Sequence, residues 1–135
     1  MSSERALLIE WDPNSGKRAG GIDPRDPNLR CYGWQNMDSE PAREIRLVED
    51  DRDLSPLEGT LGVKILEGKQ AINDAIQAHI PARYSVIDMS LMTQHMKDKG
   101  MSLDGLVGKN MNEIAAEAFQ NGIAGVREIK PKLLE

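Results

Sequence analysis

The chain has one cysteine and no long apolar run. Cys31 is the only cysteine among 135 residues, so an intrachain disulfide is excluded and a reducing compartment is expected. No apolar stretch approaches the roughly 20 residues that cross a bilayer. The polar N-terminus predicts no signal peptide. The sequence therefore predicts a cytoplasmic protein that does not contact a membrane.

The chain also lacks an excess of positive charge. Its 17 Lys and Arg residues stand against 22 Asp and Glu, for a net charge of −5. Because phosphate backbones are bound by clustered Lys and Arg, a nucleic-acid partner is not expected. Acidity is concentrated between Glu40 and Glu58, where seven acids face three arginines, a local net charge of −4. This run is interpreted as a solvated loop or as a site for a basic partner or a cation.

A chain of this length is the size of one domain and can bury a core without a disulfide or a metal. Strand-like patterns occur at residues 6–11, 42–48, 60–67, 83–88 and 126–129. Helical spacing occurs at residues 69–79, 91–99 and 111–120. The sequence predicts a single α/β or α+β domain over residues 1–135, with a mixed sheet of about five short strands and about two or three covering helices.

The order of elements in the C-terminal half suggests a crossover. Strand 60–67 is followed by Gly68 and helix 69–79, and strand 83–88 comes next. Two strands of one sheet joined in this way form a crossover connection, which is right-handed when the strands are parallel. We expect a strand–helix–strand core within residues 60–130.

Residues 12–41 show neither helical nor strand periodicity. A loop of this length is uncommon in a compact domain and is usually functional or disordered. Disordered segments are poor in aromatics. The aromatic residues of the chain are two Trp, two Tyr and one Phe. Three of them lie in this stretch, if Trp11 at its start is counted. We therefore predict an irregular N-terminal arm that lies against either its own domain or a partner.

The arm contains candidate residues for contact with another protein. Trp, Tyr and Arg dominate binding hot spots. On this basis the predicted partner-binding residues are Trp11, Arg30, Tyr32 and Trp34. The alternative is that these rings pack onto the chain's own sheet. Cys31 between them is interpreted as an unreactive thiol.

A second set of polar residues follows the predicted strands. Ligands of open α/β sheets bind at the carboxyl ends of the strands, here near the ends of strands 60–67 and 83–88. The possible ligand-binding residues are His79, Arg83, Tyr84, Asp88 and His95. The favoured explanation of His79 is structural, as a basic residue at a helix C-terminus. No catalytic arrangement can be read from residue spacing, so an enzyme is not excluded but no catalytic residue is predicted.

Methionines are frequent between residues 89 and 111. Met92, His95 and Met96 fall on one helical face, a spacing at which thioether and imidazole groups can bind Cu(I). Methionine also fills irregular cores and adaptable contact surfaces. Core packing is the favoured interpretation, and no metal or cofactor is predicted.

The sequence thus leads to three functional hypotheses. The first is an accessory or structural subunit of a larger assembly, binding another protein subunit or a second copy through the arm. The second is a small-molecule-binding protein or enzyme. The third is a soft-metal binder.

Overall fold

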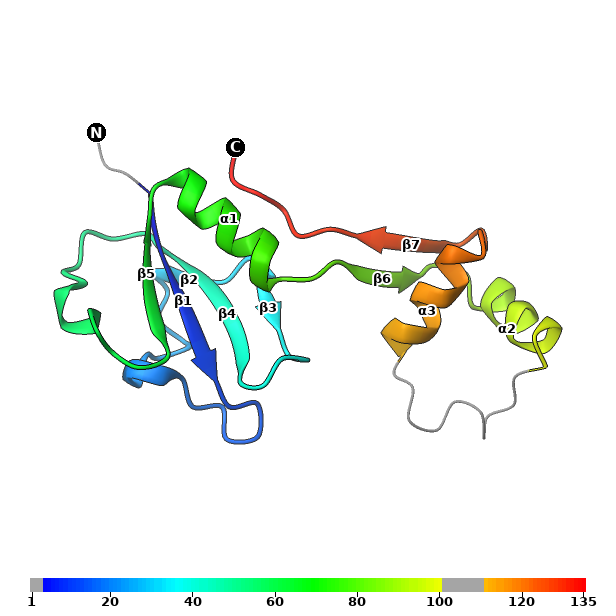
Figure 1. Ribbon diagram of the computed structural model, residues 1–135, viewed down its shortest axis with the longest axis horizontal. Helices are drawn as coiled ribbons and strands as arrows, with labels where there is room; N and C mark the ends of the chain where they lie inside the picture. The colour runs from blue at the N-terminus through cyan, green and yellow to red at the C-terminus, as the bar shows by residue number, and fades with distance from the viewer. Residues whose placement is uncertain (1–3, 101–110) are drawn as a thin grey trace. The chain divides into compact units, whose positions relative to one another are not determined.

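The computed structural model describes residues 4–100 and 111–135 (Figure 1). The chain divides into two compact units, which are described separately. One unit runs to Pro81 and includes residues 131–135, and the other comprises residues 82–130. The sequence of residues 102–107 is compatible with a helical turn or a loop, and Asn110 is a candidate first residue for helix 111–120; both lie outside the described residues. Across the described part, every helix falls short of the length and apolar character that a bilayer crossing requires.

The first unit is built on an antiparallel sheet of five strands. The strands are β1 (Arg5–Trp11), β2 (Leu29–Arg30), β3 (Gln35–Asn36), β4 (Ala42–Val48) and β5 (Val63–Glu67). Their order is β2-β4-β1-β5, with β3 also paired to β4. Helix α1 (Lys69–His79) packs against one face, and short 3-10 turns occur at Ala19–Gly21 and Ser55–Leu57.

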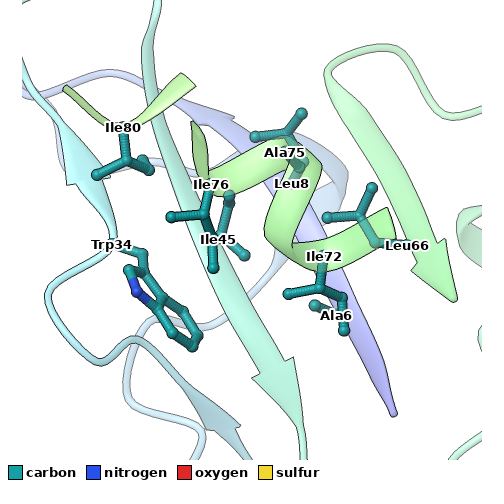
Figure 2. Close-up of a cluster of buried hydrophobic side chains, with 9 residues drawn as sticks. All are labelled: Ala6, Leu8, Trp34, Ile45, Leu66, Ile72, Ala75, Ile76 and Ile80. Carbon is teal, nitrogen blue, oxygen red and sulfur yellow. The ribbon is translucent and has the colours of Figure 1, made fainter. Parts of the chain in front are cut away.

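Strand β1 buries side chains on both faces of the sheet, as its nearly continuous apolar sequence requires. Ala6 and Leu8 face α1, where they join Ile72 and Ile76 in the largest core cluster (Figure 2). Leu7 and Ile9 alternate with them and belong to a cluster on the opposite face. The central strand is therefore covered on both sides.

The arm and the loop after β4 together cover the second face. Leu29 and Leu54 are buried against Leu7 and Ile9, and Ile22 packs at the margin of this cluster. The turn at Ala19–Gly21 also approaches the sheet closely. A Cβ on Gly62 would lie 2.8 Å from the Cβ of Ala19, and the positive φ of Gly62, 84°, independently favours glycine there. Residues 12–41 are part of the fold.

Trp34 belongs to the core beneath α1. Its side chain is 2% exposed and packs with Ile45, Ile76 and Ile80 (Figure 2). Its Nε1 donates a hydrogen bond to the carbonyl oxygen of Lys132 at 2.8 Å. The sheet has few aromatics to fill its core, and this ring supplies the needed volume. The prediction that Trp34 contacts a partner is corrected on this basis.

The C-terminal residues return to the first unit. The Asn73 side chain on α1 donates to the carbonyl oxygen of Leu134 and accepts from its amide, at 2.9 and 2.8 Å. Leu133 and Leu134 pack at the edge of the core. Residues 82–130 are therefore an insertion between two segments of the first unit.

The second unit pairs a short antiparallel sheet with two helices. Its elements are β6 (Arg83–Val86), α2 (Met89–Asp98), α3 (Met111–Gln120) and β7 (Val126–Ile129). Met92, Ile114, Ala118 and Val126 form its core. Asp88 begins α2, accepting hydrogen bonds from the amides of Ser90 and Leu91. Gly100 follows the helix with a φ of 67°, a left-handed conformation that favours glycine after a helix.

The α+β class predicted from the sequence is confirmed, and the predicted strands and helices are all present in the described residues. The predicted crossover is wrong. β5 pairs with β1, whereas β6 pairs with β7 in a separate sheet. The local pattern of strand, helix and strand does not specify which sheet a strand joins.

Replacement of Trp34 by alanine should lower the free energy of unfolding by about 3–5 kcal/mol, because it opens a cavity in the core and removes the bond to Lys132. Tyr32→Phe is the control, since the half-exposed Tyr32 loses only a surface hydrogen bond to Glu49. Its effect should stay within about 0.5 kcal/mol. Denaturant unfolding measures both. Equal losses in the two variants would contradict the core role of Trp34.

Candidate functional site

The remaining aromatic and basic residues predicted for the arm are largely engaged within the fold. Trp11 is 9% exposed, and the guanidinium of Arg18 lies 4.4 Å from its ring centroid. Arg30 forms an exposed ion pair with Glu49 at 2.8 Å. Tyr32 donates to the same carboxylate at 2.6 Å and packs edge-on against Trp34. Arg30 and Tyr32 are thus the predicted arm contacts that stay on the surface.

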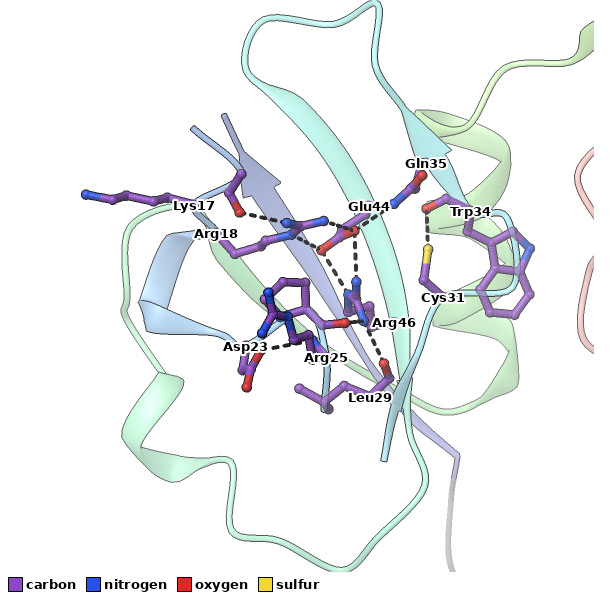
Figure 3. Close-up of polar contacts among 12 residues, drawn as sticks. Lys17, Arg18, Asp23, Arg25, Leu29, Cys31, Trp34, Gln35, Glu44 and Arg46 are labelled. Atoms are coloured by element: carbon purple, nitrogen blue, oxygen red, sulfur yellow. Dashed lines mark hydrogen bonds and ion pairs between the residues drawn. The ribbon is translucent and has the colours of Figure 1, made fainter. Parts of the chain in front are cut away.

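A buried ion cluster that was not predicted from the sequence lies where the arm meets β4 (Figure 3). The fully buried Glu44 carboxylate accepts from Nε of Arg18 and Nε of Arg46, each at 2.9 Å. Gln35 donates to its other oxygen at 3.1 Å. Arg46 also donates to the carbonyl oxygen of Leu29 at 2.7 Å. One carboxylate therefore connects three segments of chain.

The cluster sets the titration of the groups around it. Burial acts to raise the pKa of Glu44, but hydrogen bonds from Arg18, Arg46 and Gln35 outweigh it and hold that pKa below its usual value. Burial, together with the Glu44 charge, raises the pKa of the Cys31 thiol. A thiol held in its protonated form is a poor nucleophile, as expected from the sequence.

A hollow of about 570 Å³ lies beside this cluster at the base of the arm. Its walls come from both ends of the arm and include Trp11, Lys17, Met37 and Pro41. Arg18 also lines it, but its guanidinium is already bound to Glu44 and to the carbonyl oxygen of Gly16. Figure 3 shows the Lys17 side chain pointing away from the cluster. The lining contains no paired nucleophile and base.

The predicted ligand-binding residues are divided between the two units. His79 ends α1 in the first unit, whereas Arg83, Tyr84, Asp88 and His95 lie in the second. Asp88 is occupied as the cap of α2. Tyr84 packs against Phe119, with ring centroids 5.4 Å apart.

Met92 and His95 are both buried, and Met92 lies in the core of the second unit. The buried Nε2 of His95 has no hydrogen-bond partner among the described residues. Within residues 4–100 and 111–135, no group of three or more His, Cys, Asp or Glu side chains is placed to hold a metal ion. The structure gives Met92 the packing role that the sequence favoured.

The outer edge of β5 lies at one end of the strand order of the first unit. Among the described residues, this strand pairs with β1 only. The amide of Glu10 donates to the carbonyl oxygen of Gly62 and the amide of Gly68 donates to that of Glu4, both at 2.8 Å. The backbone N–H and C=O groups of even-numbered β5 residues therefore point toward β1, and those of odd-numbered residues point outward. Ile65 presents an N–H and a C=O on this edge, and Glu67 presents an N–H.

A hollow lies on each side of this edge. One, of about 390 Å³, runs between β5 and α1, and Leu8, Leu66 and the small side chains of Ala71, Ala75 and Ala78 form its apolar lining. The other, of about 440 Å³, separates β5 from the loop at residues 57–59. Lys64, Ile65 and Glu67 line both. The exposed backbone of β5 therefore lies where two hollows meet.

Strands β2, β3 and β6 present less free backbone at their edges. β2 and β3 are two residues long each. In the second unit, the Asn112 side chain on α3 accepts from the Tyr84 amide at 2.8 Å, which closes part of the β6 edge. Proteins commonly protect exposed edges with lysine, and Lys64 on β5 is the one sequence signal of its edge position. His79 lines the α1-side hollow and is the one predicted ligand-binding residue found at this edge.

Comparison of the chain with protein-family models, with curated proteins and with solved structures found no match.

Substitution of Glu44 by glutamine should lower the free energy of unfolding by about 3–5 kcal/mol, because it leaves two buried guanidinium groups without a counter-charge. Glu40→Gln is the matched control, since Glu40 is an exposed acid at the end of the arm, just before β4. The control should change stability by less than about 0.5 kcal/mol. Denaturant unfolding at neutral pH compares them. A Glu44 variant as stable as the control would show that the cluster is dispensable.

Proposed function

We propose that this protein is an accessory subunit that holds an extended segment of a partner protein by strand addition at β5. The observation that carries the proposal is the set of outward N–H and C=O groups at Ile65 and Glu67, flanked on both sides by hollows. An extended segment matches both features. Its backbone pairs with the edge, and its alternate side chains point to opposite faces.

The energetics favour a modest but specific interaction. Each backbone hydrogen bond that replaces hydrogen bonds to water contributes about 0.5–1.5 kcal/mol to the binding free energy. Most of the remaining affinity must then come from apolar side chains that enter the hollows. The alanines on α1 leave space for such side chains beside Leu66. Ile65 and Val63 offer an apolar surface toward the other hollow.

This proposal keeps the accessory-subunit hypothesis and changes the contact surface. Trp11 and Trp34 are buried within the first unit, so they do not supply the partner-binding side chains expected of the arm. Arg30 and Tyr32 stay available at the surface for additional contacts. In this role the protein performs no chemistry, and its affinity depends on the conformation and side chains of the bound segment.

Selection of a displayed library of random peptides on the full chain tests the proposal. A selected peptide should slow hydrogen exchange at the amides of Ile65 and Glu67. The amides of Lys64 and Leu66 should change little, because they already face β1. Failure to select any peptide, or binding that leaves the Ile65 and Glu67 amides unaffected, would refute strand addition.

A backbone variant provides the second test. Ile65→Pro removes an outward N–H at an edge position where proline is compatible with a sheet. The loss of a bond and the clash with the added strand should weaken peptide binding about tenfold or more, while the circular dichroism spectrum is retained. Ile65→Val is the control, because it keeps the N–H and most of the side chain. Equal affinities for the two variants would contradict pairing at Ile65.

A further inference from the structure

We infer that the segment bound at β5 runs antiparallel to it and carries a lysine or arginine in its N-terminal half, opposite Glu67. This inference rests on the proposed function and adds the direction and charge of the bound segment. It depends on the opposite charges found at the two ends of the β5 edge.

The Glu67 end of the edge is acidic. A third hollow, of about 610 Å³, adjoins this end and is lined by Glu4, Arg5, Val48, Glu49, Asp50, Asp51 and Glu67. The guanidinium of Arg5 is turned to the carbonyl oxygens of Asp50 and Arg52, at 2.7 and 2.8 Å. Glu4, Asp51 and Glu67 form no ion pair with the described residues. The same Glu67 also lines both hollows beside β5.

The opposite end of the α1-side hollow is basic. Helix α1 runs back along β5, so His79 comes near the start of the strand, where Lys64 lies. Lys64 and His79 line the same hollow. Burial lowers the pKa of His79, and the charges of Arg43 and Lys64 lower it further. Asp74 is an acidic residue on the α1 side of the same hollow. A segment lying along the edge therefore meets the acids around Glu67 at one end and Lys64 near the other, where Glu58 lines the loop-side hollow but not the α1-side hollow.

The direction follows from the pairing of the strands. Every pair in this sheet is antiparallel, and antiparallel pairing is slightly more stable per residue than parallel pairing. In an added antiparallel strand, the N-terminal half lies opposite Glu67 and the C-terminal half lies opposite Val63 and Lys64. A basic residue of the bound segment is favoured opposite Glu67 and disfavoured near Lys64.

A second copy of this chain fits the edge less well. If two β5 strands paired about Ile65, so that their outward groups met, Lys64 of one copy would lie diagonally across from Lys64 of the other. Long side chains at diagonal positions remain within reach of one another, so these two like charges repel. The net charge of −5 on each copy adds repulsion. A segment with a positive residue, by contrast, complements the Glu67 end.

The library peptides that protect the Ile65 and Glu67 amides provide the test. Lysine or arginine should be enriched in their N-terminal halves. Moving the basic residue to the C-terminal half of such a peptide should weaken binding roughly tenfold at low salt, as expected for a few exposed charge pairs. The Glu67→Lys variant should lose or reverse this preference, whereas Asp38→Lys, a change to an exposed acid on the arm, should keep it.

The outcomes separate this inference from the proposed function. Some peptides could protect the Ile65 and Glu67 amides but bind equally well with the basic residue in either half. That result would overturn the inference and remain consistent with strand addition. A preference for charge order that persists in the Glu67→Lys variant would also overturn it. If no peptide protects these amides, both the inference and the proposed function fail.

Discussion

The pairing of Glu44 with two guanidinium groups is the interaction on which the first unit depends. A buried carboxylate is costly unless every oxygen is paired. Here Arg18 brings the start of the arm to β4, Arg46 binds the carbonyl oxygen of Leu29, and Gln35 reaches the same carboxylate. A segment without helical or strand periodicity is thereby held over one face of the sheet. Ordering of residues 12–41 is a consequence of polar pairing as well as apolar burial.

The sequence predicted local structure well and long-range structure poorly. Alternation and helical spacing identified β5, α1 and α3 because these patterns reflect burial of one face. The same patterns contain no information about strand partners, so the predicted crossover between β5 and β6 was wrong. Trp34 was recognised as an anchor, but its partner is the carbonyl oxygen of Lys132, almost one hundred positions away in the chain. Single-sequence reasoning has no access to such a contact.

The candidate site was hidden for a related reason. Lys64 and Glu67 look like ordinary exposed residues of an alternating strand, and Ala71, Ala75 and Ala78 look like ordinary helix formers. They become a site only because β5 is at the edge of the sheet and α1 returns beside it. His79 was the one predicted residue that lies there. A binding surface made of backbone groups has no residue signature, so its recognition requires the strand order.

The hydrogen bonds between Asn73 and Leu134 have a consequence for how this chain can vary. They fix the last residues to α1, so the first unit holds both the entry and the exit of residues 82–130. Strands β6 and β7, at the two ends of that insertion, are paired with each other. A module with adjacent ends can be lengthened, shortened or exchanged while the order of strands in its host is unchanged. The host sheet and the inserted module can therefore diverge at different rates.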